Sequence, residues 1–122
     1  MQNWQSVNST RQGELLEAAA DPIEVFRADW RTYQTVIREN YMFHREISGA
    51  IGRMLRQLPG TLSVLDLGCG DACQISEMLD PGQIAEYCGC DLSAQALEAA
   101  QHHLAPLGNR ARLLCRDMLT VL

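Results

Sequence analysis

The sequence predicts an α/β fold in which a parallel sheet follows a group of N-terminal helices. Two observations carry this prediction. After Gly60 the apolar residues change from helical spacing to short continuous runs that alternate with helical segments, and a glycine-rich turn joins the first run to the next helix. Of the 122 residues, 47% are apolar and 20% are charged, a balance that supports one buried core and argues against native disorder.

The first expected helix begins with a recognisable set of residues. Asp21 is suited to the N-cap, Pro22 to the first helical position and Glu24 to the position three residues beyond the cap. We therefore expect a helix from Pro22 to about Glu39.

A second helix is expected to follow near Tyr41. Its apolar residues repeat at intervals of three and four, and Pro59-Gly60 ends the pattern. The repeating positions are Ile47, Ile51, Met54, Leu55 and Leu58. Residues 1–60 are thus predicted to form an N-terminal helical cap.

Two strands and a helix are expected next. Leu62–Leu67 is a short apolar run, and after the sequence Gly-Cys-Gly-Asp a helix follows, with apolar residues at helical spacing. Those residues are Ala72, Ile75, Met78 and Leu79. Asp80-Pro81-Gly82 ends this helix, and a second strand is predicted from Ala85 to Cys90, with Asp91 directly after it.

The last two expected elements complete a β-α-β-α-β unit over residues 61–122. Ser93 is a good N-cap for a helix that runs through Ala94–Leu104 to Pro106 or Gly108. Arg112–Arg116 supplies a third strand, which Asp117 closes. This order favours parallel strands joined by right-handed crossovers.

Polar and glycine residues gather where the three predicted strands end. Gly68 and Gly70 allow a tight turn and a close approach of ligand to backbone, and the helix behind them presents free N–H groups. Asp91 lies 21 residues after Gly70, where such folds place a carboxylate that accepts hydrogen bonds from ribose hydroxyls. A nucleotide-like cofactor is therefore predicted.

The glycine pattern favours a cationic ligand over a dinucleotide. A dinucleotide fingerprint needs a third Gly or Ala where this chain has Cys73. In addition, Asp66 adds negative charge close to the place that a pyrophosphate would occupy.

The segment Leu62–Leu119 resembles the class I S-adenosylmethionine-dependent methyltransferases. Their first motif reads acid-x-Gly-x-Gly-x-Gly/Ala, and Asp66, Gly68, Gly70 and Ala72 match it. The resemblance implies a Rossmann-like three-layer α/β sandwich, of which strands 1–3 are present, and S-adenosyl-L-methionine as the cofactor.

The resemblance also implies roles for individual residues. The glycine loop would lie against the methionine portion of the cofactor, Asp91 would hold the ribose and Asp117 the adenine amino group. The predicted cofactor-binding residues are Asp66, Gly68, Cys69, Gly70, Asp91, Leu92, Asp117 and Met118. For Asp66 two roles stay open: contact with the cofactor's amino group, or orientation of the glycine loop through its backbone N–H groups.

The helices before Leu62 look like the N-terminal cap of the same family. The stretch 40–45 is a candidate for an aromatic lid or for an arginine that binds the cofactor carboxylate. The alternative for Tyr41 and Phe43 is an ordinary place in the core.

The chain departs from the family because it stops after its third strand. The family's sheet has seven strands, so this chain is expected to be the cofactor-binding half of a larger enzyme, with residues following Leu122. The exposed edge of the first strand is then expected to accept the missing C-terminal half or a second copy.

Composition excludes several kinds of partner and site. The net charge is −5 and all ten basic residues are arginines dispersed among carboxylates, so no nucleic-acid partner is expected. No run is apolar enough to span a bilayer and Met1–Arg11 lacks a signal-peptide core, which predicts a cytoplasmic protein. The five cysteines match no zinc or redox spacing, so we expect reduced, buried thiols and no metal site.

The leading hypothesis is therefore a methyltransferase that uses S-adenosyl-L-methionine and a small-molecule acceptor. No residue is a convincing base, so no catalytic residue is assigned. Two alternatives stay open: an NAD(P)-binding oxidoreductase, and a non-catalytic module that binds an adenosyl cofactor.

Overall fold

The computed structural model describes residue 24 and residues 29–122, and the chain divides into two compact units, Met1–Tyr33 and Gln34–Leu122. Helix α3, Trp30–Arg38, crosses from one unit to the other and ends one residue before the predicted Glu39. The predicted helix start at Asp21 and Pro22 lies outside the described residues.

Helix α4, His44–Gln57, is the second predicted helix, and it begins three residues after Tyr41. Asn40 and Phe43 have left-handed backbone angles, so the helix cannot extend further toward the N-terminus. Tyr41 is 71% exposed and Phe43 is 68% exposed. The interpretation of these two rings as core residues is therefore wrong.

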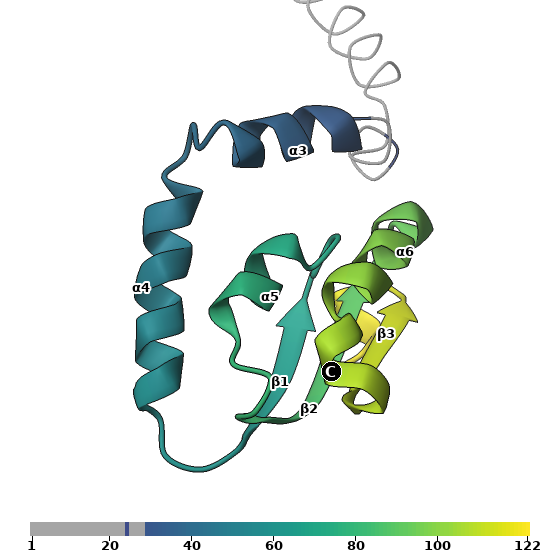
Figure 1. Cartoon of the computed structure of the whole chain (residues 1–122). Coiled ribbons are helices and arrows are strands. Elements are labelled where there is room, and N and C mark those ends of the chain that lie inside the picture. Colours follow the sequence, from purple (N-terminus) through teal and green to yellow (C-terminus); the bar gives the residue numbers. More distant parts are fainter. Residues whose placement is uncertain (1–23, 25–28) are drawn as a thin grey trace, which may run out of the picture. The chain divides into compact units, whose positions relative to one another are not determined.

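Three parallel strands form the sheet in the order β1-β2-β3 (Figure 1). Strand β1 is Leu62–Leu67, as predicted. Strand β2 is Ile84–Asp91, so it begins one residue earlier than expected and includes the aspartate. Strand β3 is Ala111–Cys115, displaced by one residue from the prediction.

The predicted crossover helices are present. Helix α5 is Cys73–Met78 and helix α6 is Ala94–His103, and the Ser93 hydroxyl oxygen caps α6 by accepting the N–H of Ala96 at 3.1 Å. Two short 3-10 helices complete the unit, η1 over Ala105–Arg110 and η2 over Met118–Thr120. The β-α-β-α-β order is confirmed.

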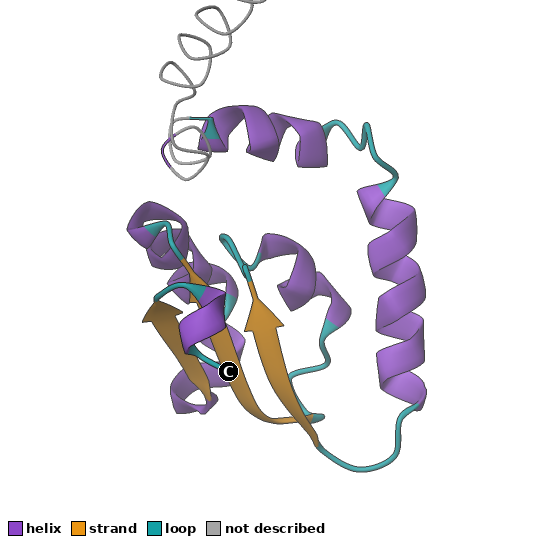
Figure 2. Ribbon diagram, turned by 180° about the vertical axis from the view of Figure 1, so that it is seen from behind, coloured by secondary structure: helices purple, strands orange, loops and turns teal. Residues whose placement is uncertain are grey.

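The core lies between one face of the sheet and the helices that cover it. Leu62 and Val64 of β1 pack against this core, while Leu65 and Leu67 on the opposite face are 50% and 37% exposed. The buried cluster comprises Ala72, Leu79, Ile84, Tyr87, Ala100, Leu104 and Leu107. In the part of the chain that the structure describes, no helix covers β1 on the opposite face (Figure 2).

Helix α4 packs beside α5, and a glycine permits the close approach (Figures 1 and 2). A Cβ added at Gly52 would lie 3.3 Å from backbone atoms of Met78. The Gln83 side-chain amide donates to the backbone oxygens of Leu55 and Leu58, at 3.0 and 2.9 Å, and so satisfies carbonyls at the end of α4.

The five cysteines are free thiols, but their expected burial is only partly correct. Cys90 is fully buried, whereas Cys115 is exposed and the other three are intermediate. The error at Cys115 arises because it ends an edge strand, where it lies against the Leu92 carbonyl rather than inside the core.

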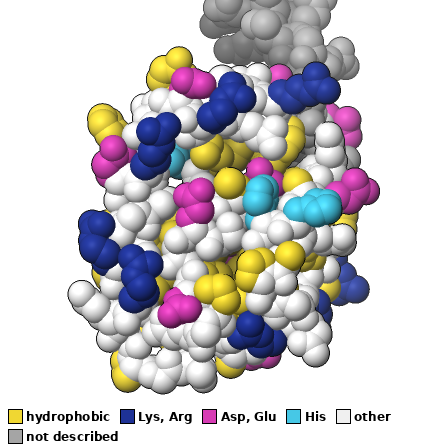
Figure 3. Space-filling view, in the orientation of Figure 1, with side chains coloured by type: hydrophobic (Ala, Val, Ile, Leu, Met, Phe, Trp, Pro, Cys, Tyr) yellow, Lys and Arg dark blue, Asp and Glu magenta, His cyan; other side chains and the backbone are white. Residues whose placement is uncertain are grey.

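On the face drawn in Figure 3, arginine side chains are spread among acidic and apolar ones rather than gathered into one patch. Among the described residues, no helix is both long and apolar enough to cross a membrane.

The exposed β1 edge generates a prediction about association. We expect the 122-residue chain to self-associate, and Leu65→Lys to shift sedimentation-velocity profiles toward monomer, because a charge at an edge opposes strand addition. Leu58→Lys is the matched control, since Leu58 is 48% exposed but lies outside the sheet. A monodisperse wild-type monomer would contradict this expectation.

Candidate functional site

A loop of unusual backbone shape connects β1 to α5. Gly68, Gly70 and Ala72 have φ values of +75°, +55° and +56°, so every second residue is left-handed. Glycine adopts this region freely, but alanine there costs about 1–2 kcal/mol. The Ala72 methyl is 2% exposed within the core, which offsets that cost.

The end of β2 holds this loop in place. The N–H groups of Gly68 and Cys69 both donate to the Cys90 carbonyl, at 2.8 and 3.0 Å. The next free donor, the N–H of Gly70, binds Oδ2 of Asp91 at 2.9 Å. Three consecutive loop amides are therefore fixed by two residues of the neighbouring strand.

Asp91 joins the loop to the following helix. Its Oδ1 accepts the N–H of Ser93 at 2.8 Å, and the residue is only 8% exposed. Each carboxylate oxygen keeps a second acceptor position after these bonds. The ribose role predicted for Asp91 thus has acceptor capacity available and stays a prediction.

Asp66 is bound by a side chain rather than by the loop. Its Oδ2 accepts the Tyr87 hydroxyl at 2.8 Å. Because the loop amides are taken by Cys90 and Asp91, the alternative in which Asp66 orients the loop is wrong. Burial raises the pKa of Asp66, the Tyr87 hydrogen bond lowers it, and the nearby Asp91 charge raises it.

The end of β3 reaches the corner formed by the glycine loop, residues 68–72, and Asp91. A Cβ added at Gly68 would lie 3.9 Å from Cε of Met118, so the methionine side chain borders the glycine loop. Asp117 caps η2 by accepting the N–H of Leu119 at 2.9 Å, and it is exposed. The adenine contacts predicted for Asp117, Met118 and Leu92 stay predictions.

Cys69 enters the site through its backbone. Its sulfur lies over β2, where a Cβ added at Gly89 would be 2.9 Å away. Burial, together with the charges of Asp66 and Asp91, raises the pKa of the thiol to about 12. The side chain is therefore a protonated packing group at neutral pH.

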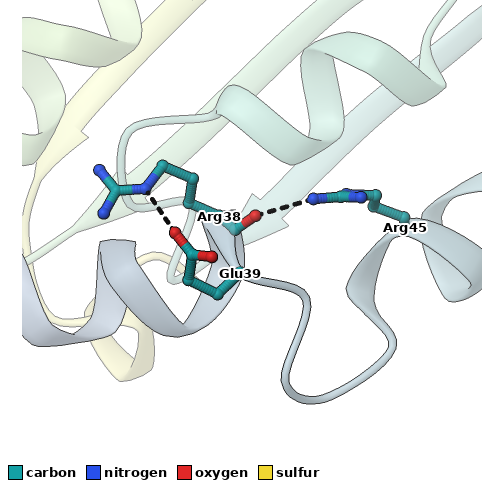
Figure 4. Close-up of polar contacts among 3 residues, drawn as sticks. All are labelled: Arg38, Glu39 and Arg45. Atoms are coloured by element: carbon teal, nitrogen blue, oxygen red, sulfur yellow. Dashed lines mark hydrogen bonds and ion pairs between the residues drawn. The ribbon is translucent and has the colours of Figure 1, made fainter.

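A polar cleft beside the loop was not predicted from the sequence. It has a volume of about 480 Å³ and lies among residues of α3, α4, α5 and the end of α6 within the second unit. Arg38, Arg45, Asp71 and Glu77 supply its charges. Arg45 donates to the backbone oxygen of Arg38 at 2.9 Å, and the Arg38 side chain is turned to Glu39 (Figure 4).

Asp71 connects the cleft to the glycine loop. Its Oδ2 accepts the Gln34 amide at 3.4 Å, its Oδ1 accepts the N–H of Cys73 at 3.0 Å, and its carbonyl lies 2.8 Å from Nδ1 of His103. His103 is exposed, and its contact with Asp71 spans 32 positions, which a periodic pattern cannot reveal. Helical spacing therefore gave no signal for this part of the site.

Comparison with known proteins agrees with this geometry. Residues 64–122 match the family described as "Methyltransferase domain". No curated protein sequence matches the chain.

Three solved structures illustrate the similarity. DhpI in complex with SAH is 20% identical over 78% of this chain and 43% of its own, with a TM-score of 0.56, and it shows that the fold is shared. SAM-dependent methyltransferases from Thiobacillus denitrificans and Geobacter sulfurreducens, both in complex with S-adenosyl-L-homocysteine, are 26% and 28% identical. Each aligns with 59% of this chain and 29% of its own, with TM-scores of 0.48 and 0.46. The chain thus spans less than half the length of these structures.

The raised pKa of Asp66 predicts a pH-dependent effect of Asp66→Asn. In the folded state the protonated carboxyl is favoured, so this group stabilises the fold most below the ordinary aspartate pKa of about 4, and that contribution is lost as the pH rises through the folded value. Asparagine avoids the buried charge and still accepts from Tyr87. In calorimetry we expect Asp66→Asn to have a higher Tm than wild type at pH 7. The Tm values of the two proteins should converge below about pH 4. A lower Tm at pH 7 would contradict this account.

A second variant, Asp91→Ala, tests whether this carboxylate holds the corner together. It leaves the N–H groups of Gly70 and Ser93 without their acceptor, and each buried unpaired donor costs about 1–3 kcal/mol. We expect urea unfolding without ligand to show a loss of about 2 kcal/mol or more. Asp117→Ala is the control, because its N–H partner is exposed and the loss should be smaller.

Proposed function

We propose that this chain, whose residues 64–122 match the family described as "Methyltransferase domain", binds S-adenosyl-L-methionine at the glycine loop and supports methyl transfer to a small-molecule acceptor. The single observation that carries the proposal is the convergence at one corner of the glycine loop, Asp91 and the end of β3. The same family match favours this proposal over an NAD(P)-binding oxidoreductase.

Charge at this corner suits the cofactor. Four carboxylates, those of Asp66, Asp71, Asp91 and Asp117, lie in the loop or at the carboxyl ends of the strands. A pyrophosphate would be repelled there, whereas the ammonium and sulfonium groups of S-adenosylmethionine are attracted. The residues present therefore fit this cofactor better than a dinucleotide.

We assign the cofactor's parts to residues as follows. The backbone of Gly68, Cys69 and Gly70 would line the methionine portion, with Asp66 on its ammonium group. Asp91 would accept the ribose hydroxyls through its remaining acceptor positions, and Met118 and Leu92 would flank the adenine ring, with Asp117 accepting from the adenine amino group.

The cofactor's carboxylate is assigned to Arg45. The guanidinium uses one nitrogen to bind the Arg38 carbonyl, and its other N–H groups remain donors on a cleft that Asp71 joins to the loop. An arginine fork binds a carboxylate well because its donors are planar and permanently charged. The stretch 40–45 thus contributes an arginine, while Tyr41 and Phe43 stay candidates for a lid.

The bound cofactor supplies an electrophilic methyl group on a sulfonium. The glycine loop, Asp66 and Asp91 would hold the cofactor so that this methyl group is presented to the acceptor's lone pair. The chain's own residues contribute by binding and alignment, which convert an encounter into an oriented reaction. No catalytic base is assigned among the residues of this chain.

The exposed strand β1 points to a structural partner. We propose that a C-terminal methyltransferase half or a second copy covers Leu65 and Leu67. The five free thiols support a reducing, cytoplasmic location. A non-catalytic adenosyl-binding module is the second candidate, because the chain spans only 29–43% of the solved structures that it resembles.

Calorimetric titration of S-adenosylhomocysteine into wild type and Gly68→Val tests the proposal. The added side chain fills space within 4 Å of which only Met118 lies, so we expect weak binding by the 122-residue wild type and at least a tenfold further loss in the variant. Gly60→Val is the matched control, since Gly60 has a similar φ of +76° but lies outside the site, with nothing within 4 Å of an added Cβ. Equal loss in both variants, or no binding by wild type, would contradict the proposal.

A further inference from the structure

Tyr87 is a buried polar residue for which the glycine motif gives no reason. It lies in the middle of β2, its side chain is 1% exposed, and its hydroxyl donates to Oδ2 of Asp66 at 2.8 Å. Asp66 is the first residue of the motif on the neighbouring strand, so the bond crosses from β2 to β1 directly beneath the glycine loop.

Gly89 makes this contact sterically feasible. It pairs with Asp66 in the sheet, two residues after Tyr87 on the same face. A Cβ at position 89 would lie 2.9 Å from Cε1 of Tyr87 and 2.9 Å from the sulfur of Cys69, closer than real Cβ atoms approach other atoms. Because Gly89 has no side chain, the tyrosine ring has room to reach toward Asp66.

We propose that Tyr87 is a positioning residue, whose hydroxyl holds Oδ2 of Asp66 so that Oδ1 is presented to the ammonium group of the ligand. Among the hydrogen bonds of the described residues, Oδ1 has no partner. The proposal rests on the proposed function, because it names how that site's first acidic residue is oriented.

The surrounding charges give the tyrosine a second effect. Burial and the Asp91 charge raise the pKa of Asp66, and the hydrogen bond from Tyr87 is the contact that lowers it. Cys69, with a thiol pKa of about 12, adds no charge at neutral pH. Burial and Asp66 raise the pKa of Tyr87, so its hydroxyl remains a donor. The tyrosine thus helps to keep the carboxylate ionised.

The test is Tyr87→Phe, which keeps the ring and removes the hydroxyl. We expect the pKa of Asp66, followed by carbon-13 NMR of its carboxyl group, to rise. At pH 7 the affinity for S-adenosylhomocysteine should fall about three- to tenfold, as for loss of one ordinary hydrogen bond, and the loss should diminish at higher pH as Asp66 ionises.

Two further variants serve as a second disruption of the contact and as a control. Gly89→Ala displaces the Tyr87 ring and should raise the pKa of Asp66, as Tyr87→Phe does. Tyr41→Phe removes a hydroxyl from an exposed ring and should leave the pKa of Asp66 unchanged.

The outcomes separate this proposal from the function on which it rests. An unchanged pKa of Asp66 in folded Tyr87→Phe overturns the positioning role, and so does a raised pKa with unchanged affinity at every pH. If wild type binds no S-adenosylhomocysteine, the proposed function fails, whereas the pKa of Asp66 still confirms or overturns the Tyr87 contact.

Discussion

The carboxylate of Asp91 is the interaction on which the rest of the site depends. One oxygen holds the glycine loop at Gly70 and the other holds the chain at Ser93, where α6 begins. Since Ser93 itself caps α6, a single buried side chain fixes the relative positions of two crossover connections. Its burial is tolerated because both oxygens are hydrogen-bonded to backbone amides.

The same corner shows how a small unit combines stability with an acidic surface. Carboxylates at adjacent strand ends repel one another, and desolvation increases the cost of ionising Asp66. The structure offsets this cost with donors, namely backbone amides for Asp91 and a phenol for Asp66. A ligand with positive charge would complete the compensation, so cofactor binding and the stability of the corner are linked.

The sequence predicted the order of elements because local signals were strong there: the apolar run of β1, the glycines of the loop and the Ser93 cap all act over a few residues. It also placed Asp91 and Met118 at one corner, since parallel strands end at the same edge. It missed the contacts from Tyr87 to Asp66 and from His103 to Asp71, because neither arises from periodicity or spacing. Of the two roles left open for Tyr41 and Phe43, the place in the core is wrong, since apolar character alone does not establish burial.

Ala72 has a consequence for how the loop responds to a ligand. Its backbone is the last left-handed position of the ligand corner, while its methyl group belongs to the hydrophobic core. Any rearrangement of the corner would pull that methyl out of its packed surroundings, so the core resists alternative loop conformations. The corner is consequently preorganised, and a cofactor that binds there loses little affinity to the entropy of ordering the chain.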